Sequence, residues 1–199
     1  MTQAASEIEL ESFAIIAREA DLSRFGPMGR EVAARIIHSS GDIGIATDLI
    51  LPEAAVEAGV AALAARAPLI VDVRMLAAGI PRYPAITAID LATGVPAGST
   101  RSYQGMRRAL LEYPAGCVVA IGSAPTALRA VLEVSAVKTP CLVAGFPVGF
   151  VGAVESKEEL CRSSLSALSC RSRRGGSPMA AAAINAMLLM SKGEYRVAR

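Results

Sequence analysis

The chain has 199 residues, which is enough for one domain with a sizeable buried core. Its hydrophobic fraction is 53% and its mean hydropathy is +0.44. No apolar run reaches the ~18 residues that cross a bilayer, so the excess predicts a buried sheet and a subunit interface, with no membrane partner. A net charge of +2 argues against a nucleic-acid partner bound through phosphate neutralisation.

All but three of the 20 basic residues are arginines, whose guanidinium groups bind carboxylates as a bidentate fork. This composition suits an acidic ligand, although a GC-rich genome also enriches arginine. The four cysteines show no C-x-x-C spacing and only one histidine is present, so we expect reduced, buried thiols and no metal site. The first residues are acidic where a secretory signal would be basic, so we expect a cytoplasmic protein.

The first third of the chain predicts three helices. The first follows a capping box, S-x-x-E, at residues 6–9. The second runs from about 28 to 40, after Pro27 and before Gly41, and the third spans about 53–65.

From residue 68 onward, short apolar strands alternate with helices. We predict strands at 68–73, 85–90, 116–122, 140–145 and 168–171, and helices at 102–112, 125–137, 155–165 and 178–190. The alternation predicts an α/β fold with a mostly parallel sheet and helices on both faces, a three-layer α/β/α arrangement. Residues 1–199 form this single domain, with fraying expected from about residue 192. The last helix is apolar on nearly all sides and should be buried.

Glycine-rich turns follow three successive predicted strands, at 122–126, 145–152 and 175–178, with Ser177 as the expected N-cap of the last helix. Ligands of such sheets bind beyond the carboxyl ends of the strands, and free N–H groups at helix starts bind anions. We therefore expect a surface for a multiply anionic ligand. Neither G-x-G-x-x-G nor the P-loop pattern is present, but an enzyme that binds a nucleotide or an acyl phosphate stays an alternative.

His38, the only histidine, lies near the end of the second predicted helix, where the helix dipole favours the protonated imidazolium. Helical spacing places it on one face with Glu31 and Arg35. Arg35 would oppose protonation, whereas Asp42, one turn on, would support it. His38 is therefore a candidate general acid, with a structural or surface role as the alternative. Arg35 has its own alternative, an i,i+4 ion pair with Glu31.

Two further polar residues are candidates. Ser12 lies on the apolar side of the first helix, where its hydroxyl either bonds to a carbonyl of that helix or reaches into a pocket. Arg101 begins a predicted helix and either holds a ligand carboxylate or lies in solvent. The chain has no G-x-S-x-G elbow, so hydrolase chemistry has no basis in the sequence.

Taken together, these segments resemble the precorrin isomerase (precorrin-8X methylmutase) family over nearly the whole chain. The run PVGFVGAVESK at 147–157 is long and specific. The other matching segments are SFAII at 12–16, RIIHSSG at 35–41, TRS at 100–102, VVAIGSAPTAL at 118–128 and GGS at 175–177.

The resemblance implies a homodimer with its active site at the subunit boundary. It also implies a cofactor-free isomerase of cobalamin biosynthesis that shifts a methyl group from C11 to C12 of a corrinoid tetrapyrrole. By this resemblance His38 protonates a ring nitrogen, and the substrate is held bent toward the product. The substrate carboxylates are held by Ser12, Arg35 and Arg101 and by the glycine turns, through Gly122, Ser123, Thr126, Gly149, Gly176 and Ser177.

The chain departs from the family pattern in three places. Ser123 stands where the family usually has Asn, the lead-in before the first helix is short, and residues 171–174 are unusually basic. These departures leave a second hypothesis open, a paralogue that binds corrinoids without isomerising them. Substrates with and without cobalt both fit the sequence.

Overall fold

The computed structural model describes residues 3–197 of the chain. Its centre is a six-stranded sheet in which β1 is antiparallel to β6 and all other neighbouring strands are parallel. The mostly parallel sheet predicted from the sequence is therefore confirmed. In spatial order the strands are β1 (Leu49–Ile50), β6 (Ala167–Cys170), β5 (Leu142–Gly145), β4 (Val118–Ile121), β2 (Leu69–Val71) and β3 (Ala85–Thr87).

Five of these strands were predicted, and two details differ. β1 has only two residues, too short to leave a periodic signal, and it exists because it pairs with the end of β6. The strand predicted at 85–90 stops at Thr87, and Ala88–Leu91 forms a 3₁₀ helix. This short helix packs against Gly105, where a side chain would collide with the backbone of Ala88.

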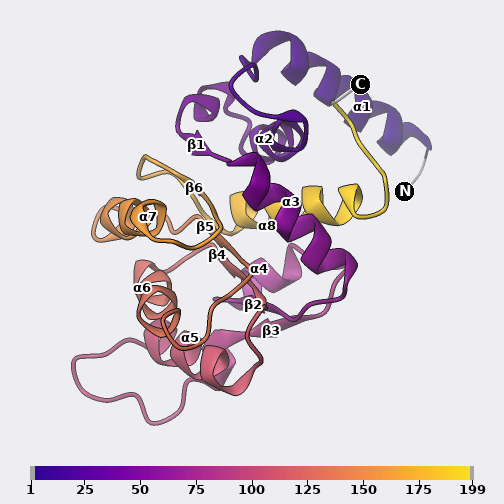
Figure 1. Cartoon of the computed structure of the whole chain (residues 1–199). Helices are drawn as coiled ribbons and strands as arrows, with labels where there is room; N and C mark the ends of the chain where they lie inside the picture. Colours follow the sequence, from indigo (N-terminus) through magenta and orange to yellow (C-terminus); the bar gives the residue numbers. More distant parts are fainter. Residues whose placement is uncertain (1–2, 198–199) are drawn as a thin grey trace.

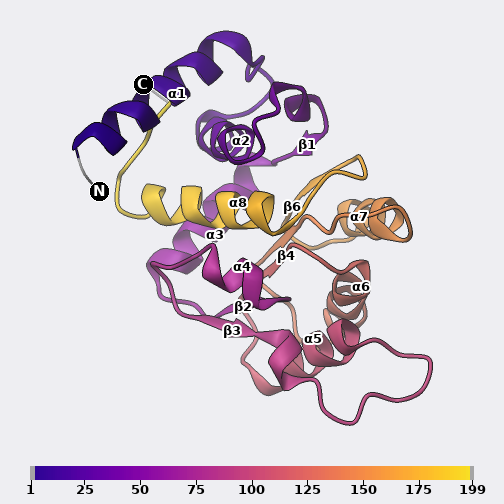
Figure 2. The same cartoon turned by 180° about the vertical axis from the view of Figure 1, so that it is seen from behind.

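Helices cover both faces of the sheet (Figures 1 and 2). One face carries α5 (Arg101–Glu112), α6 (Pro125–Val134) and α7 (Ala153–Arg162). The other carries α3 (Glu53–Ala64), α4 (Arg74–Ala78) and α8 (Ser177–Met190). The sequence did not predict α4, which is barely more than one turn long.

The N-terminal helices add a further layer to the three that were expected. α2 (Pro27–Ser40) packs against α8, and α1 (Gln3–Glu19) packs on the outside of α2 (Figure 1). α1 begins before Ser6, so the predicted capping box lies inside the helix and does not start it. α8 also begins one residue earlier than expected, at Ser177, with Gly176 as its N-cap.

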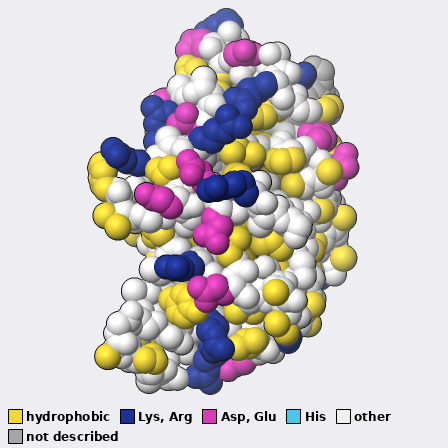
Figure 3. Space-filling view, turned by 60° about the vertical axis from the view of Figure 1, so that its left-hand side comes forward, with side chains coloured by type: hydrophobic (Ala, Val, Ile, Leu, Met, Phe, Trp, Pro, Cys, Tyr) yellow, Lys and Arg dark blue, Asp and Glu magenta, His cyan; other side chains and the backbone are white. Residues whose placement is uncertain are grey.

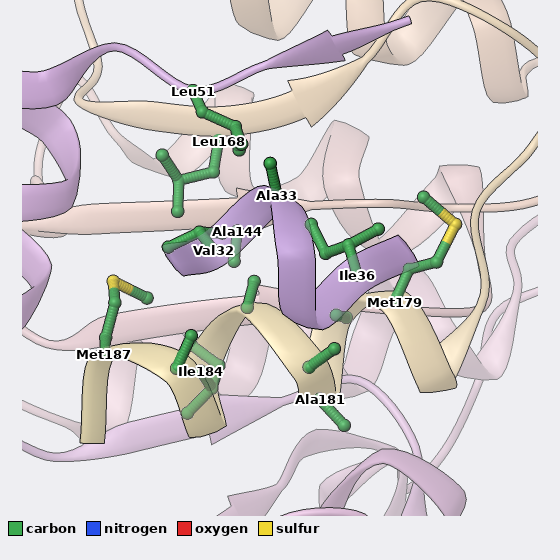
Figure 4. Close-up of a cluster of buried hydrophobic side chains, with 14 of the residues drawn as sticks. Val32, Ala33, Ile36, Leu51, Ala144, Leu168, Met179, Ala181, Ile184 and Met187 are labelled. Carbon is green, nitrogen blue, oxygen red and sulfur yellow. The ribbon is translucent and has the colours of Figure 1, made fainter. Parts of the chain in front are cut away.

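The central strands are buried on both faces, as their continuous apolar runs require. In β4, Val118 and Ala120 face the α8 side, whereas Val119 and Ile121 face α5 and α6. α8 lies between α2 and the sheet and is buried along most of its length, as predicted. Figure 4 shows side chains of α2, α8 and the sheet meeting in this cluster, among them Ile36, Ile184 and Leu168.

The segment after α8 folds back across α2. The backbone N–H groups of Arg196 and Val197 donate to the buried carboxylate of Glu31, at 2.8 and 2.6 Å. In Figures 1 and 2 this segment runs beside α1. The C-terminal residues that the structure describes thus contact the first third of the chain.

The face shown in Figure 3 carries no large area of a single charge. Basic and acidic side chains are interspersed down its middle, with apolar patches between them. Within residues 3–197, no helix is long and apolar enough to cross a membrane.

Candidate functional site

The carboxyl ends of β2 and β4 meet where the chain changes direction in the sheet. The connection after β2 leads to β3 on one side, and the connection after β4 leads to β5 on the other. Such a switch point leaves a crevice in which α/β proteins bind their ligands. In this chain Asp72 follows β2 and Gly122 follows β4 at that point.

The Asp72 carboxylate is buried at this switch point. Its oxygens accept hydrogen bonds from the backbone N–H groups of Gly122, Ser123 and Ala124, at 3.1, 2.7 and 3.1 Å. Burial raises the pKa of Asp72, because the loss of solvation outweighs the stabilisation from these donors. The N–H groups of this turn therefore already have a protein acceptor, and the geometry gives no support for their binding a ligand.

The structure brings the three glycine turns together at one edge of the sheet. Gly176 N–H donates to Phe146 O at 2.8 Å, and Gly149 N–H donates to Arg173 O at 3.3 Å. A Cβ at Gly122 would lie 2.6 Å from Cα of Ser177, so only glycine allows this approach. The backbone N–H groups of these turns thus donate to other protein atoms and are not free for a ligand: Gly122, Ser123, Gly149 and Gly176. The turns instead position the start of α8.

A cavity of about 340 Å³ opens beside the start of α8, and we call it the histidine cavity. It contains three of the predicted site residues. Its lining comes from the end of α2, from α4 and from α8: Arg35, His38, Ser39, Met75, Gly79, Ser177, Pro178, Ala181, Ala182 and Asn185.

His38 lies in the last turn of α2, which ends at Gly41 in the left-handed conformation. Its ring stacks on Phe13 of α1, with centroids 5.2 Å apart and planes 18° apart. The side chain is exposed, and within the described part of the chain no group hydrogen-bonds to its ring nitrogens. An imidazole held in this way can exchange a proton with a molecule in the cavity.

Arg35 reaches the same cavity, but its partner is not the one suggested by helical spacing. Its guanidinium pairs with Glu9 of α1 at 2.9 Å and lies over the Phe13 ring at 5.2 Å. Glu31 instead accepts the two N–H groups of the C-terminal segment. The i,i+4 alternative for Arg35 is therefore wrong, because packing of α1 and of the C-terminus supplies both residues with other partners.

Asp42 also differs from expectation. Its carboxylate lies 3.4 Å from the guanidinium of Arg174, in the basic segment that follows β6. We expected Asp42 to stabilise the charged form of His38, but its carboxylate pairs with Arg174 instead. The start of α8 and the guanidinium of Arg35, which is paired with Glu9, line the histidine cavity, and both are groups that favour an anionic ligand.

Other predicted residues lie outside the histidine cavity. Ser12 is half-buried on α1 and does not line it. Arg101 is exposed at the first position of α5. Thr126 accepts a hydrogen bond from Thr100 Oγ1 at 2.9 Å, in a separate cavity of about 300 Å³. We call this the threonine cavity; its lining consists of Gly98, Ser99, Thr100, Tyr103, Thr126, Arg129 and Glu133.

Sequence reasoning missed three residues that shape the site. Asp72 had a signal, since it is a charged residue at the end of a buried apolar run. Asn185 is the one amide in the apolar helix α8, and its Nδ2 donates to Gly79 O at 2.8 Å. Met75 is exposed on α4 at the mouth of the histidine cavity and carried no signal.

Within residues 3–197, no group of three or more His, Cys, Asp or Glu side chains is arranged to hold a metal ion. The thiols are not poised for chemistry either. Cys117 and Cys170 are buried as expected, but Cys141 is half-buried and Cys161 is exposed, so the expectation of four buried thiols is wrong. Burial raises the pKa of Cys117 to about 11, and desolvation raises the pKa of Cys141, Cys161 and Cys170 as well. In the described part of the chain, His38 is therefore the best candidate for proton transfer in an open cavity.

Comparison with known proteins gives a consistent result. The protein-family model for Precorrin-8X methylmutase matches residues 7–190. A Precorrin-8X methylmutase from Pseudomonas aeruginosa is 42% identical over 191 residues, covering 89% of this chain and 91% of the relative. A Cobalt-precorrin-8 methylmutase from Synechocystis is 35% identical over 207 residues, covering 92% and 95%. The solved precorrin-8x methyl mutase from Thermus thermophilus has a TM-score of 0.82 at 32% identity, covering 94% and 98%.

Proposed function

This chain belongs to the precorrin-8X methylmutase family and is an isomerase of cobalamin biosynthesis, and we propose that it moves a methyl group from C11 to C12 of its corrinoid substrate with His38 as the proton donor. One observation carries the assignment of His38. The only imidazole of the chain lies exposed in the histidine cavity, beside the start of α8 and the switch point of the sheet.

The reaction is a rearrangement, so substrate and product have the same atoms. A proton passes from the His38 imidazolium to a ring nitrogen and draws electrons out of the conjugated system. The methyl then leaves C11 and bonds to C12 on the same face of the ring, and the proton returns to His38. General acid catalysis of this kind contributes about 10²- to 10⁴-fold to a rate.

Contacts with α1 hold the acid in place. Phe13 is buried and stacks on the imidazole, so the ring is oriented without a hydrogen bond that would occupy its nitrogens. Arg35 is oriented by Glu9 and the same Phe13 ring, which leaves part of its guanidinium free to face the cavity. Arg35, Ser177 and the start of α8 would hold one substrate carboxylate close to His38.

A second copy of the chain would complete the site. Val148, Phe150 and Val151 lie on the loop after β5 and are 46%, 84% and 88% exposed. Apolar side chains gathered on one exposed loop favour an interface. Ile8 and Ile15, seven positions apart on one face of α1, are exposed apolar residues that form a second surface of this kind. We propose a homodimer in which the substrate lies between the subunits and in which Ser12, Arg101, Ser123 and Thr126 contact its outer carboxylates.

The test is conversion of purified substrate followed by absorbance. The wild-type chain is incubated with precorrin-8X and, separately, with cobalt-precorrin-8, since relatives carry both names. We expect the spectrum of the rearranged pigment with at least one of them, and its loss in His38→Ala. Full turnover by His38→Ala would contradict the role of His38. Pigment binding by the wild type without conversion would indicate the non-catalytic corrinoid binder.

The cytoplasmic location stays a prediction, to be checked by cell fractionation.

A further inference from the structure

A second cavity, of about 280 Å³, adjoins the histidine cavity. The two share Arg35, Gly79 and Asn185 in their linings, so they lie side by side. We call it the arginine cavity, because Arg82 and Arg196 also line it. None of the roles assigned so far uses it.

The charges of the arginine cavity are unbalanced. Its lining contains three guanidinium groups, those of Arg35, Arg82 and Arg196, and one carboxylate, that of Glu9. Glu9 is paired with Arg35 at 2.9 Å, with both side chains largely buried. Among the described residues, Arg82 has no ion-pair partner and is exposed. The cavity therefore attracts an anion most strongly at Arg82 and Arg196.

The fold brings Arg196 to the cavity through a long-range contact. Glu31 of α2 accepts the N–H groups of Arg196 and Val197, and this fixes the backbone of the C-terminal segment beside α1. The Arg196 guanidinium pairs with Glu194 at 3.5 Å, a long contact that leaves its N–H groups available to a better acceptor. A backbone fixed in advance lowers the entropic cost of binding a ligand.

Asn185 orders the boundary between the two cavities. Its Nδ2 donates to Gly79 O at 2.8 Å, which ties α8 to the end of α4. Arg35 spans the same boundary from α2. A planar ligand in the histidine cavity with a flexible acidic arm can therefore extend that arm past Arg35 toward Arg82 and Arg196.

We propose that the arginine cavity binds one peripheral carboxylate of the tetrapyrrole whose ring nitrogen faces His38, and that Arg82 and Arg196 are binding residues for it. This inference rests on the proposed function. The guanidinium fork matches a carboxylate in two parallel hydrogen bonds, and two such groups in one cavity select an acidic arm over a neutral one. The C-terminal segment is then part of the substrate site.

The experiment compares full-length Arg82→Ala, Arg196→Ala and the double variant with the wild type. Removal of a charged hydrogen-bond donor should raise KM about tenfold in each single variant, with kcat within about twofold of the wild type. Arg18→Ala is the matched control, because Arg18 is an exposed arginine on α1 that pairs with its neighbour Glu19 and lines none of the cavities described above. Arg82→Lys and Arg196→Lys should restore part of the affinity.

A second readout identifies the ligand group. The rearranged pigment and its derivative with amidated side-chain carboxylates are titrated by absorbance against the wild type and the double variant. The wild type should prefer the acid form, and the double variant should lose most of that preference. An unchanged KM and an unchanged preference in the double variant would overturn the inference while the wild type still converts its substrate. If the wild type itself converts no corrinoid, the proposed function fails instead.

Discussion

The histidine cavity and the threonine cavity are built in different ways. In the histidine cavity, side chains are held by partners far away in the chain: Arg35 pairs with Glu9, and His38 stacks on Phe13. In the threonine cavity the partners are as far apart in the chain, but the contacts lie at the exposed surface. Thr100 Oγ1 donates to Thr126 Oγ1 at 2.9 Å, and the Tyr103 hydroxyl donates to Glu133. By contrast, the Arg35 and Glu9 side chains are only 17% and 18% exposed, and Phe13 is buried.

This difference indicates where precise positioning matters. A proton donor must be held in one orientation, and contacts with buried groups restrict it more than contacts at the exposed surface do. Groups that only hold the outer arms of a large ligand tolerate more freedom. The two cavities should therefore respond differently to mutation, with losses of turnover at the first and smaller losses of affinity at the second.

The largest effect is expected for His38→Ala. Turnover should fall by about 10²- to 10⁴-fold, because the substrate loses its proton donor, while KM changes little. Steady-state kinetics with the corrinoid substrate measure this. His38 is exposed, so the melting temperature should stay near that of the wild type. A drop in KM alone, or equal turnover, would contradict the comparison.

The next effect concerns the segment that leads into α8. Lys157 is buried and its Nζ donates to Ser172 O, to Arg174 O at 2.7 Å and to Cys170 Sγ at 3.4 Å. Lys157→Met leaves the two carbonyls without this donor and should lower the free energy of unfolding by about 3 kcal/mol. Urea denaturation measures it, and Lys192→Met, at an exposed lysine, should have no effect. Equal stability of the two variants would show that this segment is held in another way.

Asp72 is buried at the switch point and holds the turn that leads into α6. Asp72→Asn places an amide N–H₂ against a backbone donor of the Gly122 turn and should lower the free energy of unfolding by about 2 kcal/mol.

The same residue predicts a pH dependence. Burial raises the pKa of Asp72, so the folded chain holds the proton of the Asp72 carboxyl more tightly than the unfolded chain does. That stabilisation is complete below the ordinary pKa of 3.8 and is lost as pH rises through the raised value. Denaturation across this range should show the wild type losing stability relative to Asp72→Asn.

The dimer proposal predicts that the exposed loop matters only in association. Val151→Asp places a charge at a residue that is 88% exposed in one chain, and it should raise the dimer dissociation constant at least about tenfold. Val137→Asp is the control, since Val137 is 81% exposed in the turn that follows α6. Light scattering after size exclusion gives the mass of each. A Val151→Asp variant that stays as dimeric as Val137→Asp would contradict the proposed interface.

The smallest effect is expected at the threonine cavity. Thr126→Ala removes the acceptor of Thr100 and should raise KM by about two- to fivefold, with kcat unchanged. Thr139→Ala is the matched control, because the Thr139 hydroxyl donates to Ser135 O, beyond the other end of α6 and outside the threonine cavity. A large loss of turnover in Thr126→Ala would remove the distinction between the two cavities.

Much of the fold could be predicted because it follows local patterns. Continuous apolar runs identified five strands, and proline and glycine marked the ends of α2. β1 and α4 escaped prediction because elements of two and five residues carry no periodic signal. The capping box at Ser6 was misleading, since the same residues also fit the interior of a longer helix.

For the site, the sequence by itself placed His38 at a helix end and the glycine turns at the carboxyl ends of the strands. It also identified the family. These features could be predicted because they depend on residues close together in the chain. Only the tertiary structure decided which partners they have. It paired Arg35 with Glu9, directed the turn N–H groups to Asp72 and brought Arg196 beside Arg35 through Glu31. Glu31 and Arg196 are 165 residues apart, and periodicity within single helices and strands carries no information about such contacts.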